Sequence, residues 1–384
     1  MENIEDELVE FAKFRPITLI LPSLFSELKG PALPKIVQEI SKVRYINHIV
    51  IGLDKANQKE FHEAKKFFSE LPQKHEILWN DGPNLKSLDT MLAKQNLAPQ
   101  ELGKGRNVWY CMGYILSVGK AEAVALHDCD IVTYSRSLLA RLVYPVANPK
   151  FNFDFCKGYY PRVSENKVKG RVARLLVTPL LRALEKTIGF NEFISFVDSF
   201  RYPLAGEFSF RRRVLKDIRI PYDWGLEIGV LSEMFRNYAG NRLCQVDIAD
   251  NYDHKHQDIF FDDNSKGLSK MSIDIIKVII RKLASQGEPF SMSIFRSLKA
   301  TYYREALDFV QIYKKDALMN AYDIDVHEEE TAVELFAKNI MVAGQVFLDS
   351  PMESPNIPTW SRVDTALPGF LSDLRKAVEL DNKS

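Results

Sequence analysis

The chain has 384 residues, and its 51 lysines and arginines are balanced by 51 aspartates and glutamates, so that the formal net charge is zero. This length corresponds to roughly two to three domains, or to one large α/β domain with an extension. With 46% hydrophobic and 11% aromatic residues, the chain has ample material for a core, which excludes global disorder. The balanced charge argues against a dedicated nucleic-acid-binding protein, although it is compatible with a local basic patch.

The four cysteines are scattered and form no CxxC pair: Cys111, Cys129, Cys156 and Cys244. This pattern is typical of reduced intracellular thiols rather than of a disulfide framework or a zinc site. The first 14 residues are acidic and amphipathic and show no secretory signal. The most apolar later run, at 173–184, is interrupted by Pro179 and Arg182 and is too short to span a bilayer. We therefore expect a cytoplasmic protein that does not enter the membrane.

The first half of the chain alternates short apolar runs with segments of helical periodicity. Strands are predicted at 17–22, 48–52, 75–79 and 123–127, and helices at 34–43, 57–71 and 108–118. Such alternation predicts crossover units and a mainly parallel sheet, and therefore the α/β class. In sheets of this kind, ligands bind beyond the carboxyl ends of the strands. We therefore expect the chemistry in the residues that directly follow each strand.

From residue 151 the pattern loosens. Further strands are predicted at 153–160, 203–211 and 243–248, and helices at 168–188 and 223–238. After residue 264 the chain reads as helical, at 272–284, 291–313 and 331–348. We place a domain boundary near residue 265 and interpret 266–384 as a helical C-terminal extension.

The triplet Asp128-Cys129-Asp130 directly follows the apolar strand predicted at 123–127. Two carboxylates separated by one residue at a strand end can point into a cleft together, as hard oxygen ligands of Mg²⁺ or Mn²⁺. The alternative is a polar turn before the next helix, with Ser135 as the N-cap. The preceding buried strand favours the metal site.

Gly103-Lys104-Gly105-Arg106 is predicted to form a loop before a helix. Glycines allow the backbone to approach an anion closely, and a lysine offers a point charge to a diphosphate. The segment lacks the glycine spacing and the Ser or Thr of a Walker A sequence. The alternative interpretation is a flexible solvated turn.

Two basic clusters follow later in the chain. His254 and His256 are alternate residues after the strand at 243–248, so both imidazoles could face one cleft, or both could simply lie on the surface. Gly170, Arg171 and Arg174 lie at the start of a long basic helix, which suits a phosphate or a carboxylate of a small substrate. The alternative for that helix is a solvated basic face, with RNA affinity as one consequence.

Glu207 and Glu227 stand in otherwise apolar surroundings, in the segments PLAGEF and WGLE. Burying a carboxylate is costly unless it is hydrogen-bonded, so each glutamate is a candidate for a functional role. Glu227 could also be exposed on a helix.

Seven segments, taken in order, carry a resemblance to a known family. They are GKG at 103–105, DCD at 128–130, KGYY at 157–160, KGRVARLLVTPLL at 169–181, PLAGEFSFRR at 203–212, WGLEIGVL at 224–231 and VDIADNYDHKH at 246–256. The chain resembles the glucosyl-3-phosphoglycerate synthases, retaining glycosyltransferases of family 81 with a GT-A fold. The resemblance covers about two thirds of the chain, from residue 17 to residue 257. It implies a nucleotide-sugar half at about 15–135 and an acceptor half at about 136–265.

For the nucleotide, the resemblance implies a group at the end of the first strand together with one lysine: Pro22, Ser23, Leu24, Glu27 and Lys104. For a divalent metal, Mg²⁺ or Mn²⁺, it implies Asp128, Asp130 and His254, with Asp130 as the better candidate for direct ligation. The stretch Gly52-Leu53-Asp54 departs from the acidic-plus-serine pattern that the family has after its second strand.

For the acceptor, the resemblance implies Gly170 and Arg171. The family pattern has threonine at Ala173 and asparagine at His256, and Arg174 or His256 could replace those contacts. For the donor sugar, it implies Glu227, which faces the hydroxyls, Trp224, which lines the same pocket, and Leu204, whose carbonyl lies near the anomeric carbon.

The function that follows from the resemblance is transfer of glucose from UDP-glucose to the 2-hydroxyl of 3-phosphoglycerate. Retaining hydrolases use a carboxylate nucleophile about 5 Å from an acid. The sequence shows no such pair, which agrees with the front-face substitution proposed for the family. We expect a homodimer that uses part of the helical tail; the alternative is a tail that packs entirely on its own domain. We expect neither nucleic acid nor membrane as a partner.

Three alternatives stay open at the sequence level. The first is a mannosyl-3-phosphoglycerate synthase that uses GDP-mannose and the same metal–diphosphate machinery. The second is a sugar-phosphate nucleotidylyltransferase, although the segment LPSLFSELKG at 21–30 is poor in the glycines that such enzymes have after their first strand. The third is a non-catalytic binding protein, which would not need Asp128, Asp130 and His254 together.

Overall fold

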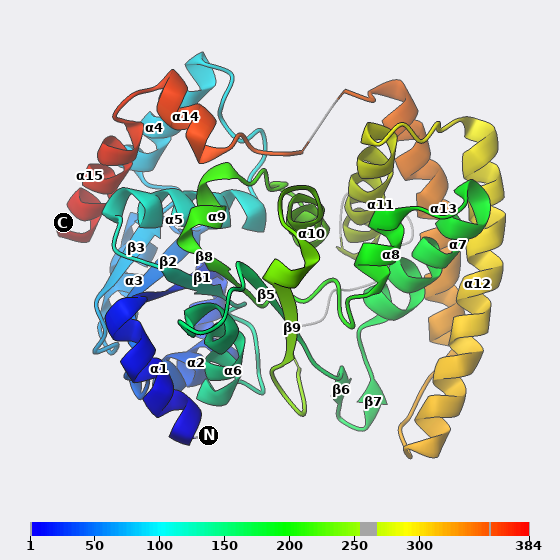
Figure 1. Cartoon of the computed structure of the whole chain (residues 1–384), viewed down its shortest axis with the longest axis horizontal. Coiled ribbons are helices and arrows are strands. Elements are labelled where there is room, and N and C mark those ends of the chain that lie inside the picture. The colour runs from blue at the N-terminus through cyan, green and yellow to red at the C-terminus, as the bar shows by residue number, and fades with distance from the viewer. Residues whose placement is uncertain (1, 254–266, 353–354, 384) are drawn as a thin grey trace.

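A seven-stranded sheet forms the centre of one lobe of the molecule (Figure 1). The structure is a computed structural model and describes residues 2–253, 267–352 and 355–383. From edge to edge the strands are β3 (His75–Trp79), β2 (Ile46–Asp54), β1 (Ile17–Leu24), β4 (Ala123–Leu126), β8 (Phe208–Arg211), β5 (Phe155–Tyr159) and β9 (Leu243–Asp247). Strand β8 runs antiparallel to both of its neighbours, and the other pairs are parallel. The prediction of a mainly parallel sheet is confirmed.

The two faces of this sheet carry two separate hydrophobic cores, because side chains along a strand point alternately to opposite faces. On β1, Leu19 and Leu21 belong to one core and Ile20 to the other. Helices cover the first core: α1 (Glu2–Phe14), α2 (Ala32–Ser41), α3 (Gln58–Phe68) and α6 (Arg136–Ala147). Others cover the second: α4 (Pro83–Lys94), α5 (Lys104–Val118) and α9 (Arg212–Asp217). In the described part of the chain both faces of the sheet are therefore covered, which leaves the ends of its strands as the expected place for a ligand.

Helix α5 begins at Lys104, so the loop predicted at Gly103–Arg106 is wrong. Gly103 is the N-cap, and Gly105 lies in the first turn, where a Cβ atom would come within 1.9 Å of the carbonyl oxygen of Pro221. Close packing against that backbone overrides the low helix propensity of glycine. The side chain of Lys104 therefore projects from a fixed helix end and not from a flexible turn.

The helix predicted at 168–188 begins later and starts with an irregular turn. A short hairpin, β6 (Val163–Ser164) and β7 (Lys167–Val168), is followed by Gly170 at φ +74°, a left-handed conformation that favours glycine. A π-helical stretch, η2 (Val172–Val177), leads into α7 (Thr178–Ile188). Pro179 has no N–H for the carbonyl of Leu175, and the hydroxyl of Tyr302 donates to that carbonyl instead, at 2.6 Å. The proline and this substitute bond account for the irregular turn.

The second lobe is a bundle of helices (Figure 1). Its elements are α7, α8 (Glu192–Asp198), α10 (Leu226–Asn237), α11 (Gly267–Ser285), α12 (Met292–Met319) and α13 (Val326–Asp349). Helix α13 packs on α11 and α12, and α12 packs on α7. By length and composition α13 could cross a membrane, but 56% of its most apolar window is buried in the molecule, as in the core helix of a bundle. The apolar face of the tail is thus buried mainly within its own chain, as at Ile279 and Phe336, while Ile312 is about half exposed.

After α13 the chain returns to the sheet lobe. Helices α14 (Trp360–Ala366) and α15 (Phe370–Lys383) pack on α4, α5, α9 and β3. Trp360 stacks on Trp109 with ring centroids 4.0 Å apart, and a Cβ atom at Gly113 would come within 2.1 Å of its ring. The extension predicted at 266–384 therefore contains a helical bundle and a terminal segment that packs with the sheet. The division of the chain at residue 265 stays a prediction.

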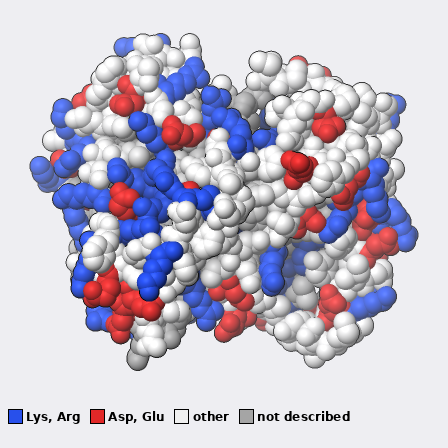
Figure 2. All heavy atoms as spheres, in the orientation of Figure 1, with Lys and Arg blue, Asp and Glu red and all other residues white. Residues whose placement is uncertain are grey.

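Lys and Arg side chains gather over β8 and α9 (Figure 2). They are partly neutralised, because Arg211 pairs with Glu122 at 3.1 Å, and Arg213 and Arg242 pair with Asp154 at 2.6 and 2.8 Å. Arg242 ends the short turn η3 (Gly240–Arg242), directly before β9. This is a local basic patch, interrupted by acids, of the kind that a balanced composition permits.

Candidate active site

A cavity of about 1170 Å³ lies where the sheet lobe meets the helical lobe. Seven of the side chains or backbones that the sequence singled out line it: Lys104, Asp128, Gly170, Arg171, Leu204, Trp224 and Glu227. They come from widely separated parts of the chain, and the fold brings them to one place. A cavity at the ends of the strands is the expected ligand site of an open α/β sheet.

The strand order explains why these residues meet. Strand β1 pairs with β2 along its whole length, up to Leu24 opposite Asp54, but its pairing with β4 ends at Ile20 opposite Leu126. Beyond those residues β1 and β4 separate, which makes the crevice of a topological switch point. The strand predicted to end at Pro22 continues to Leu24, because β2 still pairs with it there. Asp128 and Asp130 follow β4 on the other side of the crevice.

Lys104 joins two carboxylates at the centre of the site. Its Nζ atom lies 2.6 Å from Oδ1 of Asp128 and 3.0 Å from Oε1 of Glu227. Burial alone would lower the pKa of Lys104, but the charges of Asp128 and Glu227 outweigh burial and raise it. Gly206 closes the cluster from the side, since a Cβ atom there would come within 2.5 Å of Asp128. Lys104 is therefore a fixed, charged group on the cavity wall.

Asp130 adds a further carboxylate next to this cluster. Burial and the charge of Asp128 raise the pKa of Asp130 to about 7, and the charge of Glu27 acts in the same direction. Ser23 lies in hydrogen-bonding range of the thiol of Cys129. The group predicted at the end of β1 thus lies beside the Asp128–Asp130 turn. Glu27 belongs to the short helix η1 (Phe25–Lys29), which follows β1 directly.

The carboxylates of Asp128 and Asp130 fit a divalent cation. Crowded, partly buried carboxylates repel one another, and a hard cation with oxygen ligands relieves that repulsion. Among residues 2–253, 267–352 and 355–383, no group of three His, Cys, Asp or Glu side chains is arranged as a metal site. The predicted third ligand, His254, and the predicted acceptor residue His256 lie outside the described residues.

Glu207 is fully buried beneath the cavity and is hydrogen-bonded there. It accepts bonds from the hydroxyls of Tyr160 at 2.8 Å and Tyr252 at 2.6 Å, and the two tyrosine rings stack with centroids 3.6 Å apart. Burial raises the pKa of Glu207, and the hydrogen bonds from the two hydroxyls partly counteract this rise. The sequence indicated a functional role for Glu207, but its two tyrosine partners could not be predicted from it. Tyr252 precedes His254 by two residues, so this contact anchors the chain just before the predicted metal ligand.

Lys157 is a second buried cation near the site. Its ammonium group donates a hydrogen bond to the carbonyl of Ala205, the residue after Leu204. Burial lowers the pKa of Lys157 to about 8, against the opposing charges of Glu227 and Glu207. Lys157 therefore holds in place the loop that carries Leu204. Its position in KGYY gave no indication of this role.

Asp54 is held by amides at the end of β2. Its carboxylate accepts hydrogen bonds from Asn80 at 2.8 Å and from Asn107 at 3.1 Å, and burial raises its pKa. Asn107 also donates to the carbonyl of Gly52 at 2.9 Å. In this chain the stretch after the second strand thus forms a fixed polar cluster with two amides that the sequence did not single out.

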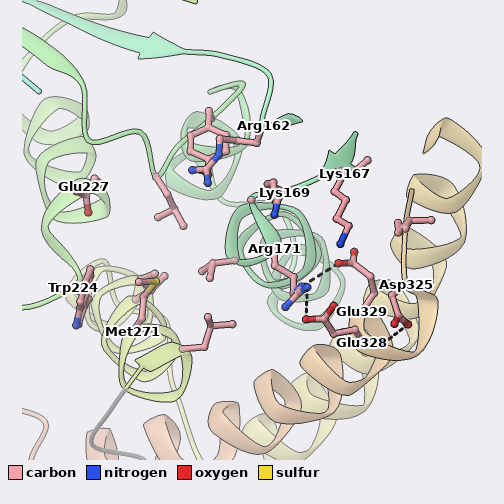
Figure 3. A pocket seen from close by; sticks show the side chains of 18 of the residues that line it. Arg162, Lys167, Lys169, Arg171, Trp224, Glu227, Met271, Asp325, Glu328 and Glu329 are labelled. Atoms are coloured by element: carbon pink, nitrogen blue, oxygen red, sulfur yellow. Dashed lines mark hydrogen bonds and ion pairs between the residues drawn. The ribbon is translucent and has the colours of Figure 1, made fainter. Parts of the chain in front are cut away.

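The basic wall of the cavity comes from the segment before α7. Gly170 and Arg171 line the cavity, together with Lys167 and Lys169 (Figure 3). Arg174 does not line it. Its guanidinium is buried over the ring of Tyr313, 4.6 Å from the ring centroid, and is held by a carboxylate of α13.

An acidic wall faces this basic wall, and the sequence did not predict it (Figure 3). It comes from the start of α13, where Asp325, Glu328 and Glu329 line the cavity, while Met271 of α11 lines it beside Trp224. Asp325 is the N-cap of α13 and accepts a hydrogen bond from the backbone of Glu328 at 3.0 Å. The capping pattern could have indicated the helix start, but no signal in the sequence places it against Arg171.

The curated proteins that this chain resembles are glucosyl-3-phosphoglycerate synthases. The chain is 45% identical over 382 residues to the glucosyl-3-phosphoglycerate synthase of Persephonella marina, covering 100% of this chain and 94% of the relative. It is 36% identical over 373 residues to the glucosyl-3-phosphoglycerate synthase of Methanococcoides burtonii, covering 96% of this chain and 91% of that relative. No protein-family model matches the chain.

Solved structures show the fold. One is glucosyl-3-phosphoglycerate synthase from Mycobacterium tuberculosis in complex with Mn²⁺, UDP and glucosyl-3-phosphoglycerate, with a TM-score of 0.52, 20% identity and coverage of 75% of this chain and 85% of that chain. Another is mannosyl-3-phosphoglycerate synthase from Rubrobacter xylanophilus, with a TM-score of 0.53, 19% identity and coverage of 74% and 80%. The expected GT-A fold with a helical C-terminal region is confirmed.

Proposed function

The chain belongs to the family of glucosyl-3-phosphoglycerate synthases, and from this membership we propose that it transfers glucose from UDP-glucose to the 2-hydroxyl of 3-phosphoglycerate. Membership makes the chain a glycosyltransferase. The donor, the acceptor hydroxyl and retention of the anomeric configuration are the parts that we propose. One observation carries the proposal: a single cavity holds the Lys104–Asp128–Glu227 cluster and, on another wall, Arg171.

Lys104 suits the leaving group of such a reaction. Cleavage of the bond between the sugar and the diphosphate develops negative charge on the diphosphate, and a fixed ammonium group stabilises that charge without reorganisation. Lys104 is already held at one place by Asp128 and Glu227, so little of its side-chain entropy remains to be lost. In this proposal Glu227, at the start of α10, accepts hydrogen bonds from the hydroxyls of the donor sugar.

Asp128 and Asp130, with His254 from beyond the described residues, would hold the divalent cation, Mg²⁺ or Mn²⁺. When bound, the cation supplies additional electrostatic stabilisation of the diphosphate. In the related enzyme from Mycobacterium tuberculosis, Mn²⁺ was bound together with UDP-glucose and phosphoglyceric acid. The donor set in this chain, carboxylate oxygens with an imidazole, is suited to either metal.

Arg171 suits the acceptor. It lies at the start of the π-helical turn, after the left-handed Gly170, and its guanidinium lines the cavity. A guanidinium forms strong, directional hydrogen bonds with phosphate and carboxylate groups, of which 3-phosphoglycerate has one each. Binding the acceptor there would leave its 2-hydroxyl to be turned towards the donor sugar.

Retention without a covalent intermediate fits the carboxylates of this cavity. In the described part of the chain, Asp128 and Glu227 are both held by Lys104, and Glu207 is buried beneath two tyrosine hydroxyls. In both arrangements the carboxylates are already engaged, by the ammonium group of Lys104 or by the tyrosine hydroxyls. None of them is presented as a nucleophile with a separate acid, as in retaining hydrolases. Front-face substitution needs only a leaving phosphate that accepts the proton of the acceptor and a nearby carbonyl, for which Leu204 is the candidate.

Product analysis tests the proposal. Purified protein is incubated with Mg²⁺ or Mn²⁺, 3-phosphoglycerate and radiolabelled UDP-glucose, and in parallel with labelled GDP-mannose. We expect a labelled, alkaline-phosphatase-sensitive product from UDP-glucose, with retained configuration by NMR. A product from GDP-mannose alone would instead identify a mannosyltransferase. If no labelled product forms from either donor, the proposal is contradicted.

A further inference from the structure

Two consecutive glutamates at the start of α13 contact the same arginine in different ways. Oε1 of Glu328 lies 2.8 Å from Nη2 of Arg171, and Oε1 of Glu329 lies 3.1 Å from its Nε (Figure 3). The side chain of Glu329 is 3% exposed, whereas that of Glu328 is 50% exposed. One carboxylate is therefore a fixed part of the interior, and the other is accessible from the cavity.

Glu329 is held by more than Arg171. Its carboxylate also pairs with the buried guanidinium of Arg174, at 2.7 Å to Nη1 and 3.1 Å to Nη2, and Arg174 in turn donates to the carbonyl of Lys169 at 2.8 Å. A buried carboxylate between two guanidiniums is costly to remove, because it would leave unbalanced buried charge. Glu329 therefore fixes the guanidinium of Arg171 relative to the backbone of the basic wall.

The start of α13 is also tied to the basic wall through the backbone. Asp323, three residues before Val326, the first residue of α13, donates its N–H to the carbonyl of Asn166 at 2.7 Å, and Lys167 forms a β-bridge with Asp323. Asn166 and Lys167 belong to the β6–β7 hairpin that precedes Gly170 and Arg171. The two walls are thus joined at their base, so that the glutamates lie at a defined distance from Arg171.

We propose that Glu329 is a positioning residue for Arg171 and that Glu328 is a competing carboxylate, which occupies Nη2 of Arg171 until an anionic acceptor replaces it. This inference rests on the proposed function, in which Arg171 binds the acceptor. Replacing one carboxylate by another at the same donor gains little. A phosphate group carries up to two charges and three acceptor oxygens, so it displaces Glu328 more readily. Glu328 thereby raises the acceptor concentration that the site needs, because Arg171 is open to the acceptor for only part of the time.

Removal of the charge at Glu328 and at Glu329 should therefore change the KM for 3-phosphoglycerate in opposite directions. Glu328→Gln should lower the KM for 3-phosphoglycerate about two- to fivefold, the range that an exposed ion pair supports. Glu329→Gln should raise that KM at least ~10-fold, because the guanidinium loses its fixed position. Glu329→Asp keeps the charge but shortens the side chain, and its KM should lie between wild type and Glu329→Gln. The Kd for UDP should not change in any of the three.

Glu334→Gln is the matched control, because Glu334 is exposed on the same helix and does not line the cavity. It removes the same charge and should leave the acceptor KM unchanged. Thermal melts establish that each variant is folded. If Glu329→Gln does not fold, the KM of Glu329→Asp for 3-phosphoglycerate tests that position instead. A rise in KM for Glu328→Gln, or no change, would overturn the competing role.

Binding of inorganic phosphate separates this inference from the proposed function. Calorimetry with UDP present measures the Kd for phosphate and for acetate in wild type and Glu328→Gln. Tighter binding of both anions in the variant supports the inference even if 3-phosphoglycerate is not a substrate. An unchanged Kd for both anions overturns it even if glucosyl transfer to 3-phosphoglycerate is observed.

Discussion

Lys104 and Glu227 lie 123 residues apart in the chain and are joined by a hydrogen bond of 3.0 Å. Each stands at the start of a helix, α5 and α10, and both helices are packed against the same loop, since Gly105 approaches Pro221 and Gly229 approaches the ring of Pro221. The loop of Pro221 thus sets the distance between the two helix starts. The cluster that holds Asp128 is a product of this packing.

We predict that Lys104→Ala lowers kcat/KM at least ~100-fold, the scale of losing one preorganised electrostatic group. The substitution also leaves Asp128 and Glu227 without their shared cation, so the affinity for UDP should fall. Steady-state kinetics and calorimetry with UDP measure both effects. Lys94→Ala, an exposed lysine of α4, is the control. Unchanged kinetics in Lys104→Ala would exclude a role for this lysine in the reaction.

We predict that turnover requires a divalent cation held by Asp130 and His254. Treatment with EDTA should abolish activity, and Mg²⁺ or Mn²⁺ should restore it. Asp130→Ala and His254→Ala should each lower turnover at least ~100-fold. The binding of Mn²⁺, followed by electron paramagnetic resonance, should weaken in both variants. Near-normal rates of the wild type in EDTA would show that no such cation is needed.

We predict that Arg171→Ala raises the KM for 3-phosphoglycerate strongly and leaves the affinity for UDP nearly unchanged. The physical reason is its place on the basic wall, which is built by a different segment from the Lys104 cluster. Acceptor titrations and UDP calorimetry separate the two effects. Loss of UDP binding with an intact acceptor KM would assign Arg171 to the donor instead.

Much of the fold and part of the site follow from the sequence. Alternating apolar runs predicted the parallel strands, and the residues after them, such as Asp128, do lie at the cavity. Other residues could not be predicted, because their positions depend on tertiary contacts between distant segments. Glu329 and Arg171 are in contact although they lie 158 residues apart in the chain, and no local sequence pattern predicts such a contact. The glycines around Lys104 suggested a turn, because packing against Pro221 cannot be read from propensity.

We predict a homodimer that uses part of the helical tail. Most of the apolar tail is buried in its own chain, but the end of α12 exposes Ile312, Leu318 and Met319. Exposed apolar side chains of this kind are candidate contacts in a two-fold dimer. Sedimentation equilibrium at micromolar concentration distinguishes a species of twice 44.1 kDa from a monomer. Leu318→Glu should dissociate the dimer while UDP binding persists, and a wild-type monomer would refute the prediction.

We predict that Trp360→Ala lowers the free energy of unfolding by about 3–5 kcal/mol, the usual cost of truncating a fully buried tryptophan. The indole of Trp360 stacks on that of Trp109 and donates to the carbonyl of Trp109 at 3.0 Å, while the indole of Trp109 donates to the carbonyl of Pro358 at 2.9 Å. Trp109 belongs to α5, the helix that begins with Lys104, so the loss should also raise the KM for the donor. Urea denaturation measures the first effect and steady-state kinetics the second. Leu380→Ala, at an exposed position of α15, should change neither. Unfolding of Trp360→Ala at the wild-type urea concentration would show that the terminal segment does not support the sheet lobe.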